Sequence, residues 1–106
     1  MYFYIIKGPF RIGFGITKDY NRREKDYTGS WGSEARFEYL FEGLPPQIKN
    51  LEFLIKTQYS DMCWVTEEWD TKWKTEWLDN GWTAEQLLEF VKELIAGRHM
   101  PLTQIR

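Results

Sequence analysis

The sequence predicts an α+β fold, in which a small, mostly antiparallel sheet of three core strands is flanked by helices. Short aromatic and β-branched segments alternate with segments of helical periodicity, in the order strand, strand, helix, strand, helix. Hydrophobic residues make up 42% of the chain, which is enough for a packed core. Because 106 residues fit one domain, we expect a single domain. Its core would lie in residues 1–60, and a tryptophan-rich extension with a final helix, residues 61–106, would pack on that core.

The first two expected strands form a hairpin. Residues 2–7 are aromatic and β-branched, and they end at Gly8-Pro9, which is a turn signal. Residues 10–17 resume the strand pattern with apolar side chains on one face. Gly13 and Gly15 lie on the other face, where they would let another group approach the backbone closely.

A helix, a third strand and a second helix follow the hairpin. Asp19 is a typical N-cap, and it predicts a helix over residues 20–27 that gives way to a loop over residues 28–33. Alternating apolar and polar residues predict the third strand at residues 35–42. Residues 45–59 then read as a helix, since proline is well tolerated in a first helical turn.

The C-terminal part contains a last helix and a tryptophan-rich segment. Thr83 and Gln86 have capping-box spacing, and the helix they open should stop near Gly97. Alternation in residues 69–77 predicts one strand with a tryptophan face. Five tryptophans fall within residues 64–82, and we expect them to pack the sheet against the last helix. A protein-binding surface is the next interpretation, and local acids argue against a base-stacking platform.

Composition excludes several kinds of chemistry. The chain has one cysteine, Cys63, and one histidine, His99, so a multi-ligand Cys/His zinc site, a disulfide framework and a redox cysteine pair are excluded. Chemistry by Tyr, Arg, Lys, Asp and Glu remains. No apolar run approaches the roughly 20 residues of a membrane span, so we expect a soluble, cytoplasmic protein without a membrane partner.

Charge is distributed unevenly along the chain. Residues 1–30 carry six cations against three acids, while residues 31–106 carry eight cations against thirteen acids. A polyanion would therefore be drawn to the N-terminal third. An ordinary solvated surface is the alternative explanation of the same pattern.

Glu52 lies on an apolar stripe of its expected helix. At 100° per residue, Ile48, Glu52 and Ile55 fall within one narrow arc. A carboxylate placed there must be paired, protonated or bound to a cation, because isolated burial of a charge is costly. The alternatives are a salt bridge to a core arginine, a helix that is partly exposed at this point, and a ligand for a hard cation such as Mg²⁺.

Three further residues could join this carboxylate. Arg23 and Tyr27 are four residues apart and share a face of the first helix, and Tyr4 lies on the first strand. An arginine, two tyrosines and a carboxylate could cleave a phosphodiester. The alternative is that the tyrosines are core residues and that Arg23 pairs with a nearby aspartate.

The N-terminal half resembles the GIY-YIG nuclease family. Tyr4, followed by two isoleucines, looks like the tyrosine of the first motif. Residues 13–23 are similar to the second motif and the helix after it, with Phe14-Gly15 at the end of the motif. The resemblance covers about residues 1–60.

The same resemblance extends to the candidate site. Arg23 stands in the place of the catalytic arginine of the family, and Tyr27 matches a position that commonly holds His or Tyr. Glu52 looks like the metal-binding glutamate. The leading tyrosine of the second motif is replaced by Gly13, and in the family that tyrosine belongs to the apparatus that activates water.

The resemblance implies a small metal-dependent endonuclease that hydrolyses DNA. Glu52 would hold Mg²⁺, or Mn²⁺ as a substitute, and Arg23 would stabilise the charged phosphoryl group. Tyr4 would handle the attacking water with help from Tyr27.

The expected partner is DNA, with Lys18, Arg22 and Lys25 on its backbone phosphates. The alternative is a catalytically impaired, GIY-YIG-like module that binds nucleic acid or protein, with Gly13 as the inactivating change. A homodimer or a protein partner stays open.

Overall fold

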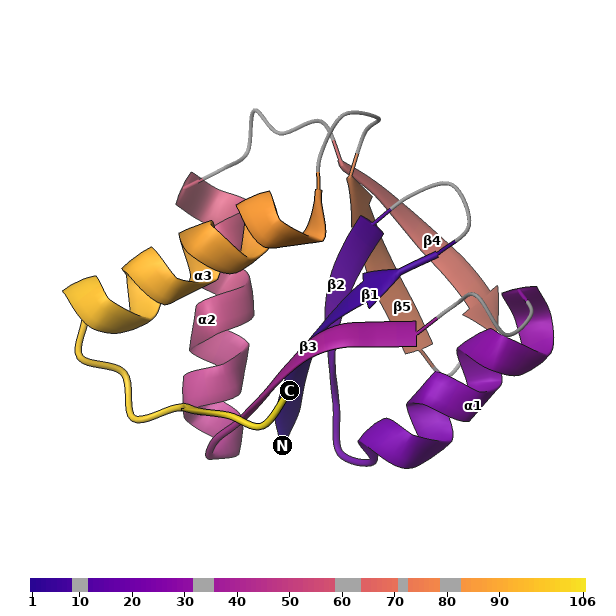
Figure 1. The fold of residues 1–106 in the computed structure, drawn as a ribbon, viewed down its shortest axis with the longest axis horizontal. Helices are drawn as coiled ribbons and strands as arrows, with labels where there is room; N and C mark the ends of the chain where they lie inside the picture. Colours follow the sequence, from indigo (N-terminus) through magenta and orange to yellow (C-terminus); the bar gives the residue numbers. More distant parts are fainter. Residues whose placement is uncertain (9–11, 32–35, 59–63, 71–72, 79–82) are drawn as a thin grey trace.

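A computed structural model gives the arrangement of the chain (Figure 1). It describes residues 1–8, 12–31, 36–58, 64–70, 73–78 and 83–106. Within these residues the helices are α1 (Tyr20–Trp31), α2 (Pro45–Gln58) and α3 (Ala84–Gly97). The strands are β1 (Tyr2–Lys7), β2 (Ile12–Thr17), β3 (Arg36–Glu42), β4 (Trp64–Asp70), β5 (Trp73–Leu78) and β6 (Thr103–Gln104). The α+β class predicted from the sequence is confirmed.

The strands form one sheet in the order β4-β5-β2-β1-β3-β6, and every neighbouring pair is antiparallel. The β1–β2 hairpin pairs Tyr2 with Thr17 and Lys7 with Ile12. On the other side of β1, the register with β3 shifts between Ile5 and Ile6. Strand β1 therefore lies between β2 and β3, and its side chains reach both faces of the sheet.

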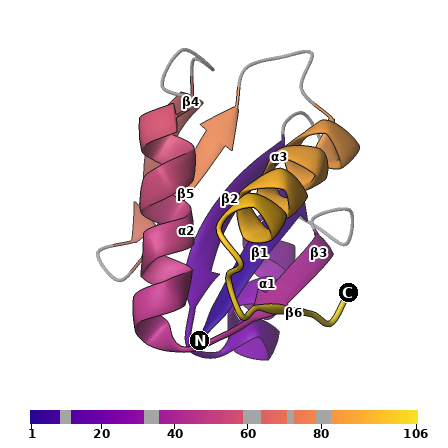
Figure 2. The same cartoon turned by 90° about the vertical axis from the view of Figure 1, so that its left-hand side faces the viewer.

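The two faces of the sheet are covered by different helices. Phe3 and Ile5 of β1 belong to the core cluster that contains the buried residues of α2 and α3. Tyr4 and Ile6, which alternate with them, belong to a second cluster that contains Tyr27 of α1. Alternate residues of a strand point to opposite faces, so α1 covers one face while α2 and α3 cover the other (Figure 2). The molecule has three layers.

Local sequence signals account for the helix starts. The Arg22 backbone N–H donates to Oδ1 of Asp19 at 3.1 Å, so Asp19 caps α1 as predicted. Thr83 and Gln86 form the expected capping box at the start of α3. Helix α1 is longer than predicted: it continues to Trp31, although residues 28–33 were expected to form a loop. The hydroxyl of Thr28 donates to the backbone oxygen of Glu24 at 3.0 Å, so this residue hydrogen-bonds within the helix instead of breaking it.

The tryptophan-rich segment also differs from the prediction. It contains two strands, β4 and β5, paired antiparallel, whereas a single strand over residues 69–77 was expected. Alternation has the same period in both strands, so the pattern does not reveal where the chain reverses. Strand β5 pairs with β2 at Gly13 and Phe14, which extends the sheet beyond three core strands. The tryptophan side chains, and their expected packing on the last helix, lie outside the described part of the chain.

The last residues return to the sheet. After α3, His99 adopts a φ of 52°, a left-handed conformation that redirects the chain. The two residues of β6 then pair with Phe41 and Glu42 of β3. We call residues 98–106 the C-terminal strap. No pattern in the sequence predicted it, because a two-residue strand has no measurable period.

Candidate functional site

Two tyrosine hydroxyls meet between the sheet and α1. The oxygens of Tyr4, on β1, and Tyr27, on α1, lie 2.9 Å apart, and both residues are fully buried. The ring of Phe37, on β3, stacks on that of Tyr4 at 4.3 Å between centroids and 12° between planes. The Tyr27 ring meets both other rings edge-on, at 6.0 Å. These three rings therefore form a compact aromatic cluster with a polar centre.

Gly15 makes room for the Tyr4 ring. It is the β2 residue directly opposite Tyr4, on the same face of the sheet. A Cβ atom added to Gly15 would lie only 2.6 Å from Cζ of Tyr4. Gly15 therefore has a packing role: because it lacks a Cβ atom, the Tyr4 ring can pack directly against its backbone.

Arg23 joins the tyrosine pair from one helical turn before Tyr27. Burial raises the pKa of Tyr27 well above its usual value, the neighbouring Tyr4 hydroxyl raises it further, and a hydrogen bond and positive charge from Arg23 only partly oppose this. Tyr27 is therefore a neutral hydroxyl at physiological pH. Since a guanidinium can only donate, Arg23 donates to the Tyr27 oxygen.

This arrangement limits what the tyrosines can do. Neither hydroxyl contacts solvent, and the raised pKa keeps Tyr27 protonated, so it cannot accept a proton as a general base. The hydroxyl pair instead orients the half-exposed Arg23. A guanidinium carries five N–H donors in a planar fork that suits phosphate oxygens. Tyr4 and Tyr27 are therefore shielded from solvent, and of the three side chains only Arg23 is exposed in part.

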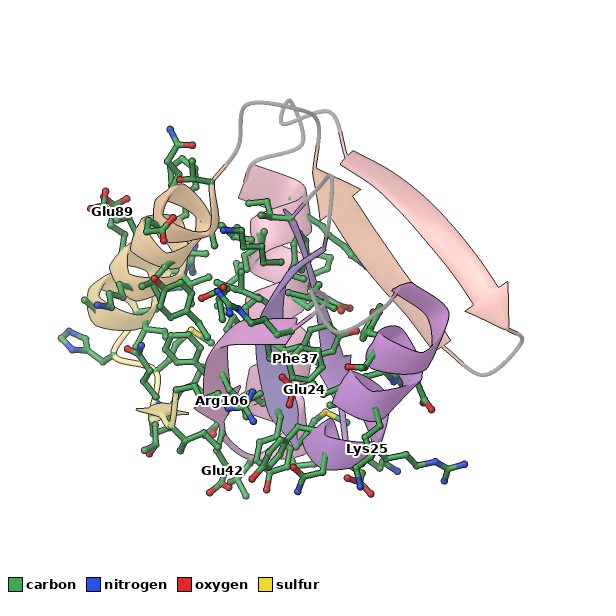
Figure 3. The ribbon with its side chains drawn as sticks, turned by 45° about the vertical axis from the view of Figure 1, so that its right-hand side comes forward. Glu24, Lys25, Phe37, Glu42, Glu89 and Arg106 are labelled. Carbon is green, nitrogen blue, oxygen red and sulfur yellow. The ribbon has the colours of Figure 1, made fainter. Side chains whose placement is uncertain are left out.

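The other predicted cations lie at the start of α1. Lys18, Arg22 and Lys25 are all exposed, and Lys25 projects from the outer side of the helix in Figure 3. The N-terminal turn of a helix adds partial positive charge to such a region. Asp19 and Asp26 are exposed there as well, so the surface is mixed, with these three cations beside two acids.

Glu52 lies in a different layer from Arg23. It is on α2, the helix that covers the other face of the sheet, next to the buried residues Leu51 and Ile55. Its side chain is 23% exposed, and its Oε1 lies 3.4 Å from Nζ of Lys56. The carboxylate is therefore partly exposed, as one alternative expected, and its partner is a lysine of the next turn of the same helix instead of a core arginine. The structure gathers Tyr4, Tyr27 and Arg23, and it carries Glu52 on the opposite layer.

The donor set at Glu52 fits only a minimal metal site. In the described part of the chain, no three or more His, Cys, Asp or Glu side chains gather in a way that could hold a metal ion. Mg²⁺ tolerates one protein carboxylate when water and phosphate supply the other ligands. Glu52 fits that kind of site, in competition with the ammonium group of Lys56.

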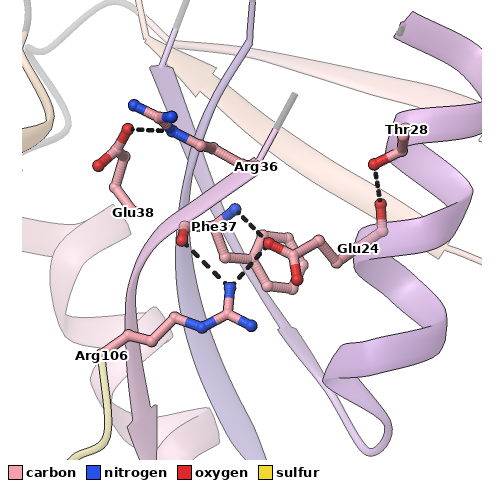
Figure 4. Close-up of polar contacts among 6 residues, drawn as sticks. All are labelled: Glu24, Thr28, Arg36, Phe37, Glu38 and Arg106. Atoms are coloured by element: carbon pink, nitrogen blue, oxygen red, sulfur yellow. Dashed lines mark hydrogen bonds and ion pairs between the residues drawn. The ribbon is translucent and has the colours of Figure 1, made fainter. Parts of the chain in front are cut away.

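A second polar group beside the site had not been predicted. Oε2 of Glu24 accepts hydrogen bonds from the Phe37 backbone N–H, at 2.9 Å, and from Nη1 of Arg106, at 2.7 Å (Figure 4). Helical spacing from Tyr20 to Tyr27 could have placed Glu24 on the inner side of α1. Its partner Arg106 gave no signal, because it is 82 residues away.

Comparison of the chain with family models, curated proteins and solved structures gave no match. None of the helices in the described ranges has the length and apolar character needed to cross a membrane. The candidate site is therefore defined by its geometry alone, that is, by the contacts among Tyr4, Tyr27 and Arg23.

Replacing Gly15 with alanine should destabilise the protein by about 1–3 kcal/mol, the usual cost of overpacking a core. The Tyr4 ring cannot retreat from the new methyl group, because Phe37 is stacked on its other side. Urea unfolding measures the effect. Gly29→Ala is the matched control: no atom lies within 4 Å of its added Cβ, and alanine in a helix is expected to stabilise by up to about 1 kcal/mol. Equal effects of the two substitutions would contradict this packing account.

Tyr27 should make stability depend on alkaline pH. Its pKa is higher in the folded than in the unfolded chain, so its contribution is complete below about pH 10 and is lost as the pH rises further. We expect Tyr27→Phe to remove up to about 1.4 kcal/mol per pH unit of this slope, measured by urea unfolding between about pH 9 and 11. Tyr39→Phe, at a half-exposed tyrosine, should retain most of the slope. An unchanged slope in Tyr27→Phe would show that this hydroxyl is not buried.

Proposed function

We propose that this chain is a small metal-dependent endonuclease of GIY-YIG type that hydrolyses DNA phosphodiester bonds. One observation carries the proposal: separate segments that the resemblance identifies converge on one point. Tyr4 comes from β1, Gly15 from β2, and Arg23 and Tyr27 from α1. The antiparallel sheet and the element order of the first 58 residues support the same proposal. A cytoplasmic location is part of it and agrees with the single cysteine.

In this proposal Arg23 is the residue that contacts the phosphate. Its guanidinium would donate to the non-bridging oxygens and stabilise the charge that develops on them. Tyr27 and Tyr4 would hold it in orientation, a role that suits their burial better than the activation of water. Lys18 and Arg22, with the neighbouring Lys25, would bind flanking phosphates of the DNA backbone.

Glu52 is the proposed ligand for Mg²⁺ or Mn²⁺. The bound ion would supply Lewis-acid stabilisation of the phosphoryl oxygens. Because Glu52 and Arg23 belong to opposite layers of the molecule, the substrate must contact α1 and α2 together.

A second candidate is a catalytically impaired module that binds nucleic acid or protein. The separation of Glu52 from Arg23, together with the ion pair between Glu52 and Lys56, favours it. Gly13, in place of a motif tyrosine, favours it as well. In that case Arg23 and the exposed cations of α1 would bind a polyanion without cleaving it.

Nicking of supercoiled plasmid separates the two candidates. We expect cleavage in Mg²⁺ or Mn²⁺ that EDTA stops. Glu52→Ala should abolish cleavage while the protein stays folded, and Glu89→Ala, at an exposed glutamate of α3, is the matched control (Figure 3). Cleavage by Glu52→Ala at the wild-type rate would show the metal assignment to be wrong. A gel shift without cleavage in either ion would establish the binding module.

Arg23 should be needed for turnover more than for affinity. Arg23→Ala is expected to lower the cleavage rate about 100-fold or more, the usual effect of losing one group that stabilises developing charge. Arg22→Ala, at the exposed neighbour, should weaken DNA binding in a gel shift and leave the rate at saturating protein unchanged. Similar effects of the two substitutions on the saturated rate would contradict the role of Arg23.

A further inference from the structure

An ion pair supplies hydrogen bonds to β3 at Phe37, on the side of the strand where none of the described strands pairs with that residue. Strand β3 pairs with β1 on one side. On its other side β6 pairs with Phe41 and Glu42, and the backbone of residues 105–106 bonds to Leu40. At Phe37, the backbone N–H donates to Oε2 of Glu24 at 2.9 Å, and the backbone oxygen accepts from Nη1 of Arg106 at 3.3 Å. The carboxylate and the guanidinium together therefore replace the C=O and N–H groups of a neighbouring strand (Figure 4).

Phe37 also holds the tyrosine pair. Its ring stacks on Tyr4 and meets Tyr27 edge-on, while its backbone binds Glu24 of the same helix as Tyr27. Helix α1 is thus attached to Phe37 twice, by a polar contact through Glu24 and by an aromatic contact through Tyr27. Arg23 directly precedes Glu24 and lies one turn before Tyr27, so these two attachments fix the rotation and the axial position of the part of the helix that carries it.

The strap fixes the other half of the ion pair. The Arg106 backbone donates to the oxygen of Leu40 at 3.3 Å, and its own oxygen accepts from the Leu40 N–H at 3.2 Å. Its guanidinium also lies 5.8 Å from the centre of the Tyr20 ring, the first residue of α1. Burial alone would raise the pKa of Glu24, but bonds from Arg106 and the Phe37 N–H lower it, so the pair is charged at neutral pH.

We propose that Glu24 and Arg106 are positioning residues of the candidate site: by completing the edge of β3 at Phe37, they hold α1 so that Arg23 stays against Tyr27. The proposal rests on the proposed function where it assigns Arg23 to phosphate. Neither residue touches the substrate in this account. Both act through the helix that presents Arg23.

Three variants distinguish completion of a strand edge from a simple charge pair. Glu24→Gln keeps an oxygen that accepts from both Phe37 N–H and Arg106, while Glu24→Ala removes it. The exchange Glu24→Arg with Arg106→Glu keeps opposite charges. It reverses donors and acceptors, however, and therefore cannot serve the N–H and C=O groups of Phe37. We expect Glu24→Gln to behave nearly as wild type, and both Glu24→Ala and the exchange to fail.

The first readout needs neither DNA nor metal. In a spectroscopic titration of tyrosine, the Tyr27 component is identified by its loss in Tyr27→Phe. We expect its apparent pKa to move toward about 10, the value of an exposed tyrosine, in Glu24→Ala and in the exchange, and to stay raised in Glu24→Gln. Arg36→Ala is the matched control, since it breaks the exposed 2.8 Å pair with Glu38 on the same strand and should leave the titration unchanged.

The second readout is the cleavage reaction. Glu24→Ala should lower kcat about 10- to 100-fold, the scale expected when a catalytic group is misplaced by about 1 Å, with a smaller change in KM. If Glu24→Ala does not fold, Arg106→Ala and Arg106→Lys carry the test. Arg106 lies at the end of the strap, and its lysine variant keeps one charged donor, so it should retain most of the activity.

Two results would overturn the proposal. Restoration of the Tyr27 titration by the charge exchange would show that only attraction between opposite charges matters. An effect of Glu24→Gln as large as that of Glu24→Ala would show the same. A chain that cuts no plasmid but gives the expected titrations would refute the nuclease proposal and leave the positioning of Arg23 established. A chain that cuts plasmid but does not give the expected titrations would support the nuclease proposal and refute the positioning role of Glu24 and Arg106.

Discussion

The hydrogen bond between the Tyr4 and Tyr27 hydroxyls is the constraint on which the rest of this structure depends. It is fully buried, so each hydroxyl must find its partner inside the protein, and a loss of alignment would leave polar groups unsatisfied. The bond requires a glycine at position 15, because any larger residue would displace the Tyr4 ring. It also sets which side of α1 faces the sheet, and thereby the direction of Arg23. This hydrogen bond thus connects the packing at Gly15, the orientation of α1 and the position of Arg23.

The division into layers determines on which face of the sheet each candidate residue lies. Strand β1 sends Tyr4 and Ile6 toward α1, and Phe3 and Ile5 toward α2 and α3. The arginine and the carboxylate therefore start from opposite faces. A helix-face argument from sequence places Glu52 on an inward stripe, but it cannot state which side of the sheet that helix covers. This choice depends on how the chain crosses from β3 to α2.

The parts of the fold set by local interactions could be predicted from the sequence. Asp19 and Thr83 cap helices through bonds only three residues long, and these need no tertiary information. The close approach at Gly15 followed from glycine on an alternating strand. The alternation around Trp73 predicted extended chain correctly but gave no sign of the reversal between β4 and β5, since both strands share the same period.

Parts set by distant contacts could not be predicted. Glu24 and Arg106 are joined only after the whole chain has folded back, and neither residue is unusual in its local sequence. The sequence left open whether the tyrosines are core residues or exposed site residues, because a strand pattern gives the face of a residue and not the depth of the layer above it; the structure shows that both are buried. The candidate site residues were therefore named in advance, while their division into a buried pair and a half-exposed arginine came from the structure.

The contact between α1 and Arg106 has a consequence for the order in which the fold is completed. Until the strap folds back, α1 is held to the sheet by its aromatic contacts and by the Tyr4–Tyr27 and Glu24–Phe37 hydrogen bonds. The Phe37 oxygen and the backbone of residues 40–42 then lack the partners that the strap supplies. Unpaired strand edges recruit other chains. Chains in which the strap is displaced should therefore self-associate through the outer side of β3.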